Sequence, residues 1–183
     1  MLLQRLFAPR LARSQGRALY DAAAFQARRP EFYRDLGAAD TVEGRFELYS
    51  LHVALLLIRL KGQGQIAAAT AQDLFDVYVR ALDDALRELG VSDVKVGRKM
   101  RGLGEAFYGR LKAYEEAIAR LPDDAELKAL LRRTALEERQ GPRPEPLAGY
   151  VARAAAALSD QTLEDLLAGR VIWPQVMAEQ AHG

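Results

Sequence analysis

The segment VEGRFELYSLHVALLLIRLK, residues 42–61, is the most informative part of the chain. Asp40 and Thr41 precede it with side chains suited to capping, and glycines follow it at positions 62 and 64, so we expect one helix over this range. Its apolar residues lie on nearly every side and leave no wide polar face: Phe46, Leu48, Leu51, Val53, Leu55, Leu56, Leu57, Ile58 and Leu60. A helix of this kind belongs at the centre of a bundle.

The rest of the chain also has helical periodicity, and no alternating strand pattern exceeds the few residues 91–96. Prolines and glycines set the boundaries, because the residue before a proline is disfavoured in a helix and glycine is common just past a helix end. Besides the central helix, we expect helices at about residues 17–28, 67–89, 93–121, 123–139, 147–158 and 163–167. The predicted fold class is all-α, a single-domain irregular helical bundle of about six to seven helices with a central apolar helix.

Within this single domain we predict three parts: a basic N-terminal segment at 1–16, a helical core at 17–140, and C-terminal helices packed on the core with an extended tail at 141–183. Arg5, Arg10 and Arg13 give the first part its charge, and a hinge is expected at Gly141, Pro142, Pro144 and Pro146. The first part is a mitochondrial presequence, a basic amphipathic segment that rests on a membrane or ribosome, or a frayed terminus. No stretch reaches the roughly 20 apolar residues that a membrane-spanning helix needs.

Composition excludes several classes of site. The 26 Lys and Arg against 25 Asp and Glu leave a net charge of +1, which gives no general attraction to nucleic acid or acidic lipid. Zero Cys and two His make thiolate and histidine metal sites improbable, and no P-loop, nucleophile elbow or HExxH motif occurs. We therefore expect a protein that is not an enzyme and has no cofactor and no small-molecule substrate. The bias to 32 Ala, and to 21 Arg against 5 Lys, suggests a bacterial coding sequence.

Three polar residues interrupt the central helix at regular intervals. Arg45, His52 and Arg59 are seven apart, so they lie on one line along the helix. In one interpretation the arginines reach water at the two ends while His52 makes one internal hydrogen bond. In the other interpretation the line faces a binding groove.

The expected helix at 93–121 breaks local rules at its start. Lys95, Arg98, Lys99 and Arg101 crowd turns where the helix dipole disfavours cations by about 0.3 to 1 kcal/mol each. Glycines at positions 97, 102, 104 and 109 cost about 1 kcal/mol each relative to alanine. Close packing inside the domain would explain the glycines, whereas a binding role would explain the cations. Basic side chains beside Phe107 and Tyr108 would also suit RNA.

Several motifs in the same order resemble the ubiquinol-cytochrome c chaperone family. They are the run 40–48, Leu51-His52, Arg59-Leu60, the run 86–93 with Val96, Lys99 and Met100, and Phe107-Tyr108-Gly109-Arg110 with Tyr114. The similarity covers about residues 19–121, with a weaker match at 166–170 ahead of Trp173-Pro174. The resemblance implies an all-helical, non-enzymatic assembly factor that helps newly made cytochrome b mature into the respiratory bc complex. Mitochondrial members act in the matrix at the inner membrane, beside the ribosome and with a small partner protein, and bacterial members would be cytoplasmic.

These observations give one hypothesis for the site and one alternative. We expect the central helix and the helix at 93–121 to form the two walls of a groove for a client or partner: Arg45, His52 and Arg59 on one wall, and Lys95, Lys99, Arg101, Phe107, Tyr108 and Arg110 on the other. The expected partner is cytochrome b or another bc-complex assembly protein, and a peripheral contact with the membrane or the ribosome is a further expectation. The expected location is the cytoplasm, either free or peripheral at the inner membrane, or the mitochondrial matrix in a eukaryote. The alternative is a helical adaptor that binds RNA or the ribosome through the basic turns.

Overall fold

The computed structural model describes residues 2–136 and 143–177. Those ranges contain eight helices and no strand: α1 Leu2–Ala27, α2 Glu31–Arg34, α3 Val42–Leu60, α4 Gln65–Glu88, α5 Asp93–Ala119, α6 Ala125–Thr134, α7 Glu145–Asp160 and α8 Leu163–Leu167. The predicted all-α class is therefore confirmed. No helix in the described part of the chain is long and apolar enough to cross a bilayer.

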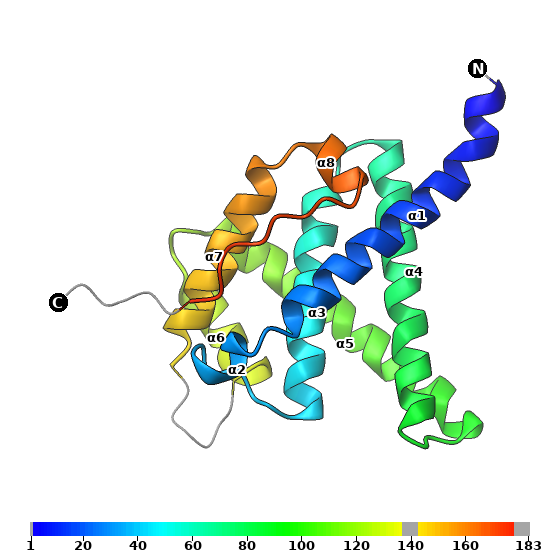
Figure 1. The fold of residues 1–183 in the computed structure, drawn as a ribbon. Coiled ribbons are helices and arrows are strands. Elements are labelled where there is room, and N and C mark those ends of the chain that lie inside the picture. Colours follow the sequence, from blue (N-terminus) through cyan, green and yellow to red (C-terminus); the bar gives the residue numbers. More distant parts are fainter. Residues whose placement is uncertain (1, 137–142, 178–183) are drawn as a thin grey trace.

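Helix α3 is the centre of the bundle, as its sequence predicted. The side-chain oxygen of Thr41 accepts a hydrogen bond from the Gly44 amide at 3.0 Å and caps its first turn. Helices α1, α4, α5 and α7 all contact α3, and Figure 1 shows them arranged around it. Leu48, Leu51 and Val53 on α3 are fully buried by these neighbours. Helix α3 therefore supplies an apolar surface that four surrounding helices share.

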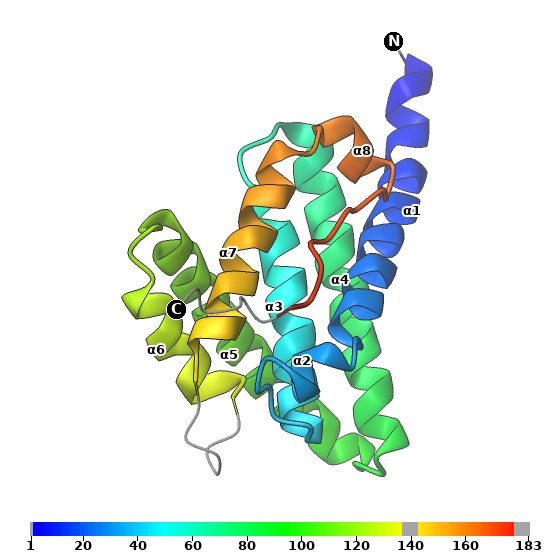
Figure 2. The ribbon, with the colours of Figure 1, turned by 60° about the vertical axis from the view of Figure 1, so that its left-hand side comes forward.

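Helices α1 and α4 form the most extensive contact between two elements, and they lie side by side in both ribbon views (Figures 1 and 2). Gly16 allows their close approach, since a Cβ there would lie 2.5 Å from an oxygen of Asp73 and 2.6 Å from the Leu74 nitrogen. Beyond α8, the extended tail runs back over the bundle toward the start of α7 (Figure 1). The Trp173 indole donates to the Ala22 carbonyl at 3.3 Å and fastens the tail to α1.

Several boundaries differ from the sequence predictions. Helix α1 begins at Leu2 rather than about Arg17, and the short α2 was not predicted. Pro30 precedes α2 in a helical conformation, because the fixed φ of proline suits the start of a helix. Within the expected hinge, Pro144 is the N-cap of α7 and Pro146 lies in its first turn, so this helix begins before the predicted residue 147, while positions 141 and 142 are outside the described residues. The division at 16/17 and 140/141 stays a prediction.

Candidate functional site

A groove of about 500 Å³ lies between α1, the first half of α3, the second half of α4 and the start of α5. We call it the four-helix groove. Most of its lining is aromatic or aliphatic: Tyr20, Tyr33, Val42, Phe46, Tyr49, Leu82, Leu86, Leu89 and Leu103. Its cationic lining residues are Arg28, Arg45 and Lys99. The structure thus brings together one predicted residue from each expected wall, Arg45 from α3 and Lys99 from α5.

The aromatic lining of the groove is held by ring contacts. Tyr20 of α1 meets Tyr49 of α3 edge to face, with ring centroids 5.4 Å apart. The Arg45 guanidinium lies 5.2 Å from the centroid of the Tyr33 ring, and its Nη2 is 2.7 Å from a carboxylate oxygen of Asp40. These contacts fix an apolar surface with a cation at its edge, while the Arg45 side chain itself stays 60% exposed.

His52 does not line any groove, which corrects that part of the predicted wall. It is completely buried, and its Nδ1–H donates to the Leu48 carbonyl at 2.7 Å. Its Nε2 then accepts from the Tyr150 hydroxyl at 2.8 Å, and that hydroxyl accepts from the Gln26 amide at 3.0 Å. Burial lowers the pKa of His52 to about 4, although the bond to Leu48 opposes the shift. The structure therefore supports the interpretation of a hydrogen-bonded core histidine, with two internal bonds rather than one.

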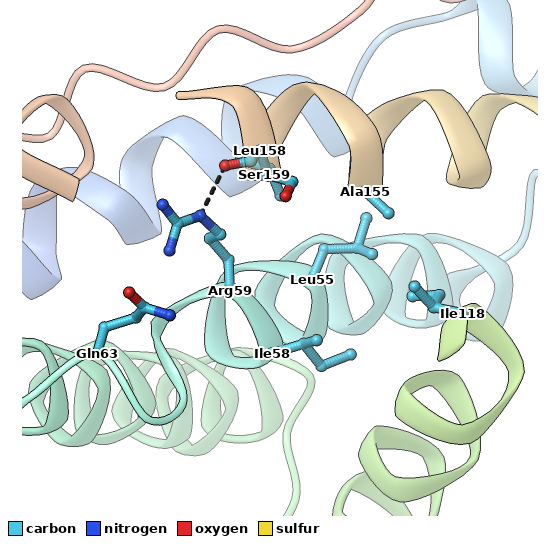
Figure 3. A pocket seen from close by; sticks show the side chains of 8 residues that line it. All are labelled: Leu55, Ile58, Arg59, Gln63, Ile118, Ala155, Leu158 and Ser159. Carbon is cyan, nitrogen blue, oxygen red and sulfur yellow. Dashed lines mark hydrogen bonds between the residues drawn. The ribbon is translucent and has the colours of Figure 1, made fainter. Parts of the chain in front are cut away.

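Arg59 has a partner inside the molecule. Its Nε donates to the Leu158 carbonyl at 2.8 Å and its Nη2 donates to the Gln161 carbonyl at 3.0 Å, at the carboxyl end of α7. Cations at that end of a helix also interact favourably with its dipole. Figure 3 shows Arg59 reaching Leu158 beside a second pocket of about 430 Å³, between α3, α5 and α7. Arg59 is thus separate from the four-helix groove, which corrects its place on the same wall as Arg45.

Phe107 and Tyr108 have different environments. Phe107 is 1% exposed and packs against Tyr78, with ring centroids 4.9 Å apart, so it belongs to the core rather than to a wall. Tyr108 is 58% exposed and contacts the Phe75 ring at 5.3 Å. Tyr108 lines a further pocket of about 390 Å³ between α3, α4 and α5. The two aromatic residues therefore do not act on one surface.

Arg110 forms a buried ion pair that sequence reasoning missed. Its Nη2 lies 2.6 Å from Oε1 of Glu47, and the exposed side-chain fractions are 26% for Arg110 and 8% for Glu47. Burial raises the pKa of the Glu47 carboxyl to about 7, and the nearby guanidinium opposes that shift. The sequence does contain a sign of this pair, because Glu47 stands between Phe46 and Leu48 on an apolar helix and a buried acid usually has a charged partner. The pair links α3 to α5, so Arg110 is not available as a residue of the predicted groove wall.

The basic start of α5 is a surface without internal partners. Lys95, Arg98, Lys99 and Arg101 are exposed, and none of the four forms an ion pair with any described residue. A Cβ added at any of the glycines 97, 102, 104 and 109 would meet nothing within 4 Å. The explanation of these glycines by packing inside the domain is therefore wrong. The exposed cations and the uncovered glycines at the start of α5 are both available to contact a partner.

Comparisons with known proteins agree on one family. The pattern of the family described as ubiquinol-cytochrome C chaperone matches residues 34–173. Ubiquinol-cytochrome-c reductase complex assembly factor 1 of Xenopus laevis is 29% identical over 155 residues, which are 83% of this chain and 76% of that protein. The Mus musculus protein of that name is 30% identical over 146 residues, 78% of this chain and 49% of that protein, so the chain spans about half of its length. The crystal structure of the Cbp3 homolog from Brucella abortus superposes with a TM-score of 0.84 at 32% identity, covering 96% of this chain and 98% of that chain.

Proposed function

The chain belongs to the ubiquinol-cytochrome c chaperone family, and on this basis we propose that it binds newly made cytochrome b during assembly of ubiquinol-cytochrome c reductase. The membership confirms the resemblance that the motifs at 40–48 and 107–110 indicated. Relatives carry the name of assembly factor for this complex, so a role in assembly is the coarse function of the family. The finer steps, binding without catalysis and cytochrome b as the client, are our proposal.

The observation that carries the proposal is the four-helix groove with cations at its edge. A newly made membrane subunit exposes apolar helical segments, and burying apolar surface gives about 25 cal/mol for each Å² removed from water. Aromatic and aliphatic side chains such as Phe46, Tyr49 and Leu103 offer such a surface. Arg45 and Lys99 suit acidic groups where the apolar segment ends, or the propionates of a haem that the client carries.

The alternative function is an adaptor for RNA or the ribosome through the basic turns of α5. The matched relatives are named as assembly factors of ubiquinol-cytochrome c reductase, which favours the client-binding function. We place the activity on the side of the membrane where cytochrome b is made, the cytoplasm in a bacterium or the matrix in a mitochondrion. Contact with the membrane would then be peripheral.

The test is co-purification from native membranes in mild detergent. Ala85 is exposed and lines the groove, so Ala85→Trp would fill it without disturbing the core. Ala119 is an exposed helical alanine outside the groove, which makes Ala119→Trp the matched control. We expect wild type and the control to retain cytochrome b and Ala85→Trp to lose it, with equal thermal stability in all three. Equal retention by Ala85→Trp would reject this groove as the client site. RNA in place of cytochrome b, bound with a steep salt dependence, would instead favour the adaptor.

A further inference from the structure

The end of α4 carries acidic residues that have no ion pair within the described part of the chain. Glu88 is the last residue of α4 and Asp84 lies one turn earlier, and both side chains are exposed. The carboxyl end of a helix has a partial negative charge that disfavours anions. Their neighbour Asp83 is different, because it is paired with Arg87 at 2.7 Å. Asp84 and Glu88 are therefore held at a local cost, and no described residue compensates it with an ion pair.

The start of α5, directly after this end of α4 in the chain, has the opposite anomaly. Lys95 and Lys99 lie in its first two turns, where the dipole disfavours cations, and they too lack ion pairs with described residues. We call the segment 84–101 the hairpin tip; it joins α4 to α5 at the lower right of Figure 1. Arg87 and Asp93 of the tip pair with each other, whereas Asp84, Glu88, Lys95 and Lys99 lie close in sequence without such pairs.

Between the two charged groups the tip exposes two large apolar side chains. Leu89 is 65% exposed and Val94 is 92% exposed. In the first turns of α5, Gly97 within the tip and Gly102 directly after it have open space where a side chain would be, although each costs the helix about 1 kcal/mol relative to alanine. Small residues on an exposed helix face let another backbone approach closely, as at packed helix pairs. A membrane surface or an RNA phosphate would be reached by long lysine side chains and would not need those glycines.

We propose that the hairpin tip is a self-complementary docking surface through which two copies of this chain associate. In a two-fold dimer the same patch is used twice, so the acids of each copy meet the bases of the other. Both sets of unpaired charge are then neutralised in one step, and Leu89 and Val94 supply the apolar centre. A partner of a single charge sign, such as an anionic lipid surface or RNA, would neutralise the lysines but be repelled by Asp84 and Glu88.

The proposed dimer has a consequence for the four-helix groove. Leu89 and Lys99 line that groove as well as belonging to the tip. Association through the tip would therefore cover one end of the groove, and a dimer would have less apolar surface open to a client. Dimer formation and client binding would compete.

The experiment is a charge swap followed by sedimentation equilibrium of the full chain. One variant is Lys95→Glu with Lys99→Glu, and the other is Asp84→Lys with Glu88→Lys. Each places its new charges where the helix dipole favours them, so both variants should keep their thermal stability. We expect each alone to dimerise at least about tenfold more weakly than wild type, and an equimolar mixture to form a heterodimer. Lys112→Glu with Arg132→Glu makes the same change of charge at exposed positions outside the tip and should dimerise like wild type.

Ionic strength gives a second readout. The wild-type dimer should weaken between about 10 mM and about 1 M salt, as the Debye length falls from about 30 Å to about 3 Å. A wild type that stays monomeric at millimolar concentration in low salt would overturn the proposal. So would a dimer that both charge variants leave unchanged. Binding of anionic vesicles or RNA that Lys95→Glu with Lys99→Glu removes, without any dimer, would assign the tip to that other partner and also reject self-association.

Discussion

Glu47 and His52 should give the free energy of unfolding two opposite dependences on pH. Burial raises the pKa of Glu47 from 4.5 to about 7, so the folded protein binds more protons than the unfolded chain within this range. Stability then falls as the pH rises through it. Burial lowers the pKa of His52 from 6.5 to about 4, so the unfolded chain binds more protons between these values, and stability rises with pH there. From pH 4.5 to pH 6.5 the two contributions oppose each other.

The size of each contribution follows from its pKa shift. One pH unit of differential protonation corresponds to about 1.4 kcal/mol, so each group contributes at most about 3 kcal/mol across its range. Solvent screening reduces the value for Glu47, whose partner Arg110 is 26% exposed. In the wild type, the free energy of unfolding should therefore change little with pH through these two groups, because the stability gained at His52 as the pH rises is offset by the stability lost at Glu47.

Glu47→Gln separates the two groups. The variant cannot ionise at this position, so its stability should rise from pH 4.5 to pH 6.5 through His52 alone. The difference between variant and wild type should move in favour of the variant by up to about 3 kcal/mol between pH 4.5 and pH 7. In His52→Gln only Glu47 titrates in this range, so the free energy of unfolding should fall as the pH rises.

The assay is urea unfolding followed by circular dichroism at a series of pH values. Glu43→Gln is the matched control, because Glu43 is an exposed acid one turn earlier on the same helix. We expect its profile to follow that of wild type. If the profile of Glu47→Gln runs parallel to the wild-type profile at every pH, then Glu47 is not ionising in a desolvated environment and the reasoning fails.

Three further variants test the bundle and the basic start of α5. Leu56→Asp should prevent cooperative folding, because Leu56 is 1% exposed and a carboxylate there has no partner; a cooperative thermal transition like that of wild type would contradict the central place of α3. Gly104→Ala should raise the free energy of unfolding by about 1 kcal/mol in urea titrations, since a Cβ there meets nothing within 4 Å; destabilisation would mean that the site is occupied. Lys95, Lys99 and Arg101 changed together to Gln should keep or slightly raise the melting temperature yet lower haem-loaded cytochrome b in membranes of a complemented strain. Full complementation would show that the basic turns of α5 are not needed for the function.

The sequence predicted the helical class and the central helix because those features depend on local patterns. The segment 42–61 is apolar around its whole circumference, and Thr41 and the glycines at 62 and 64 mark its ends. The short helix after Pro30 escaped prediction because four residues cannot establish a period. An extended tail after the last helix was predicted. Its contact from Trp173 to the Ala22 carbonyl was not, because it joins residues far apart in the sequence.

The candidate site was predicted less completely, because a helical wheel gives direction but not neighbours. Arg45, His52 and Arg59 do share one line along α3, yet different elements meet that line along its length. Asp40 and Tyr33 meet Arg45, Tyr150 of α7 covers His52, and the end of α7 accepts from Arg59. Only the first of the three faces the four-helix groove.

Residues that break local rules fall into two groups that only the structure separates. Glu47, His52 and Arg59 are polar groups on an apolar helix, and each has found a partner within the bundle: Arg110, Tyr150 and the Leu158 carbonyl. Their cost is offset internally, so they explain stability rather than recognition. Asp84, Glu88, Lys95 and Lys99 of the hairpin tip break rules in the same way, as do the glycines at 97 and 102, yet no described residue compensates them. A local cost without internal compensation is typical of an interaction surface in the free protein. For that reason we expect the second copy of this chain at the tip rather than at Glu47, His52 or Arg59, while the client binds in the four-helix groove.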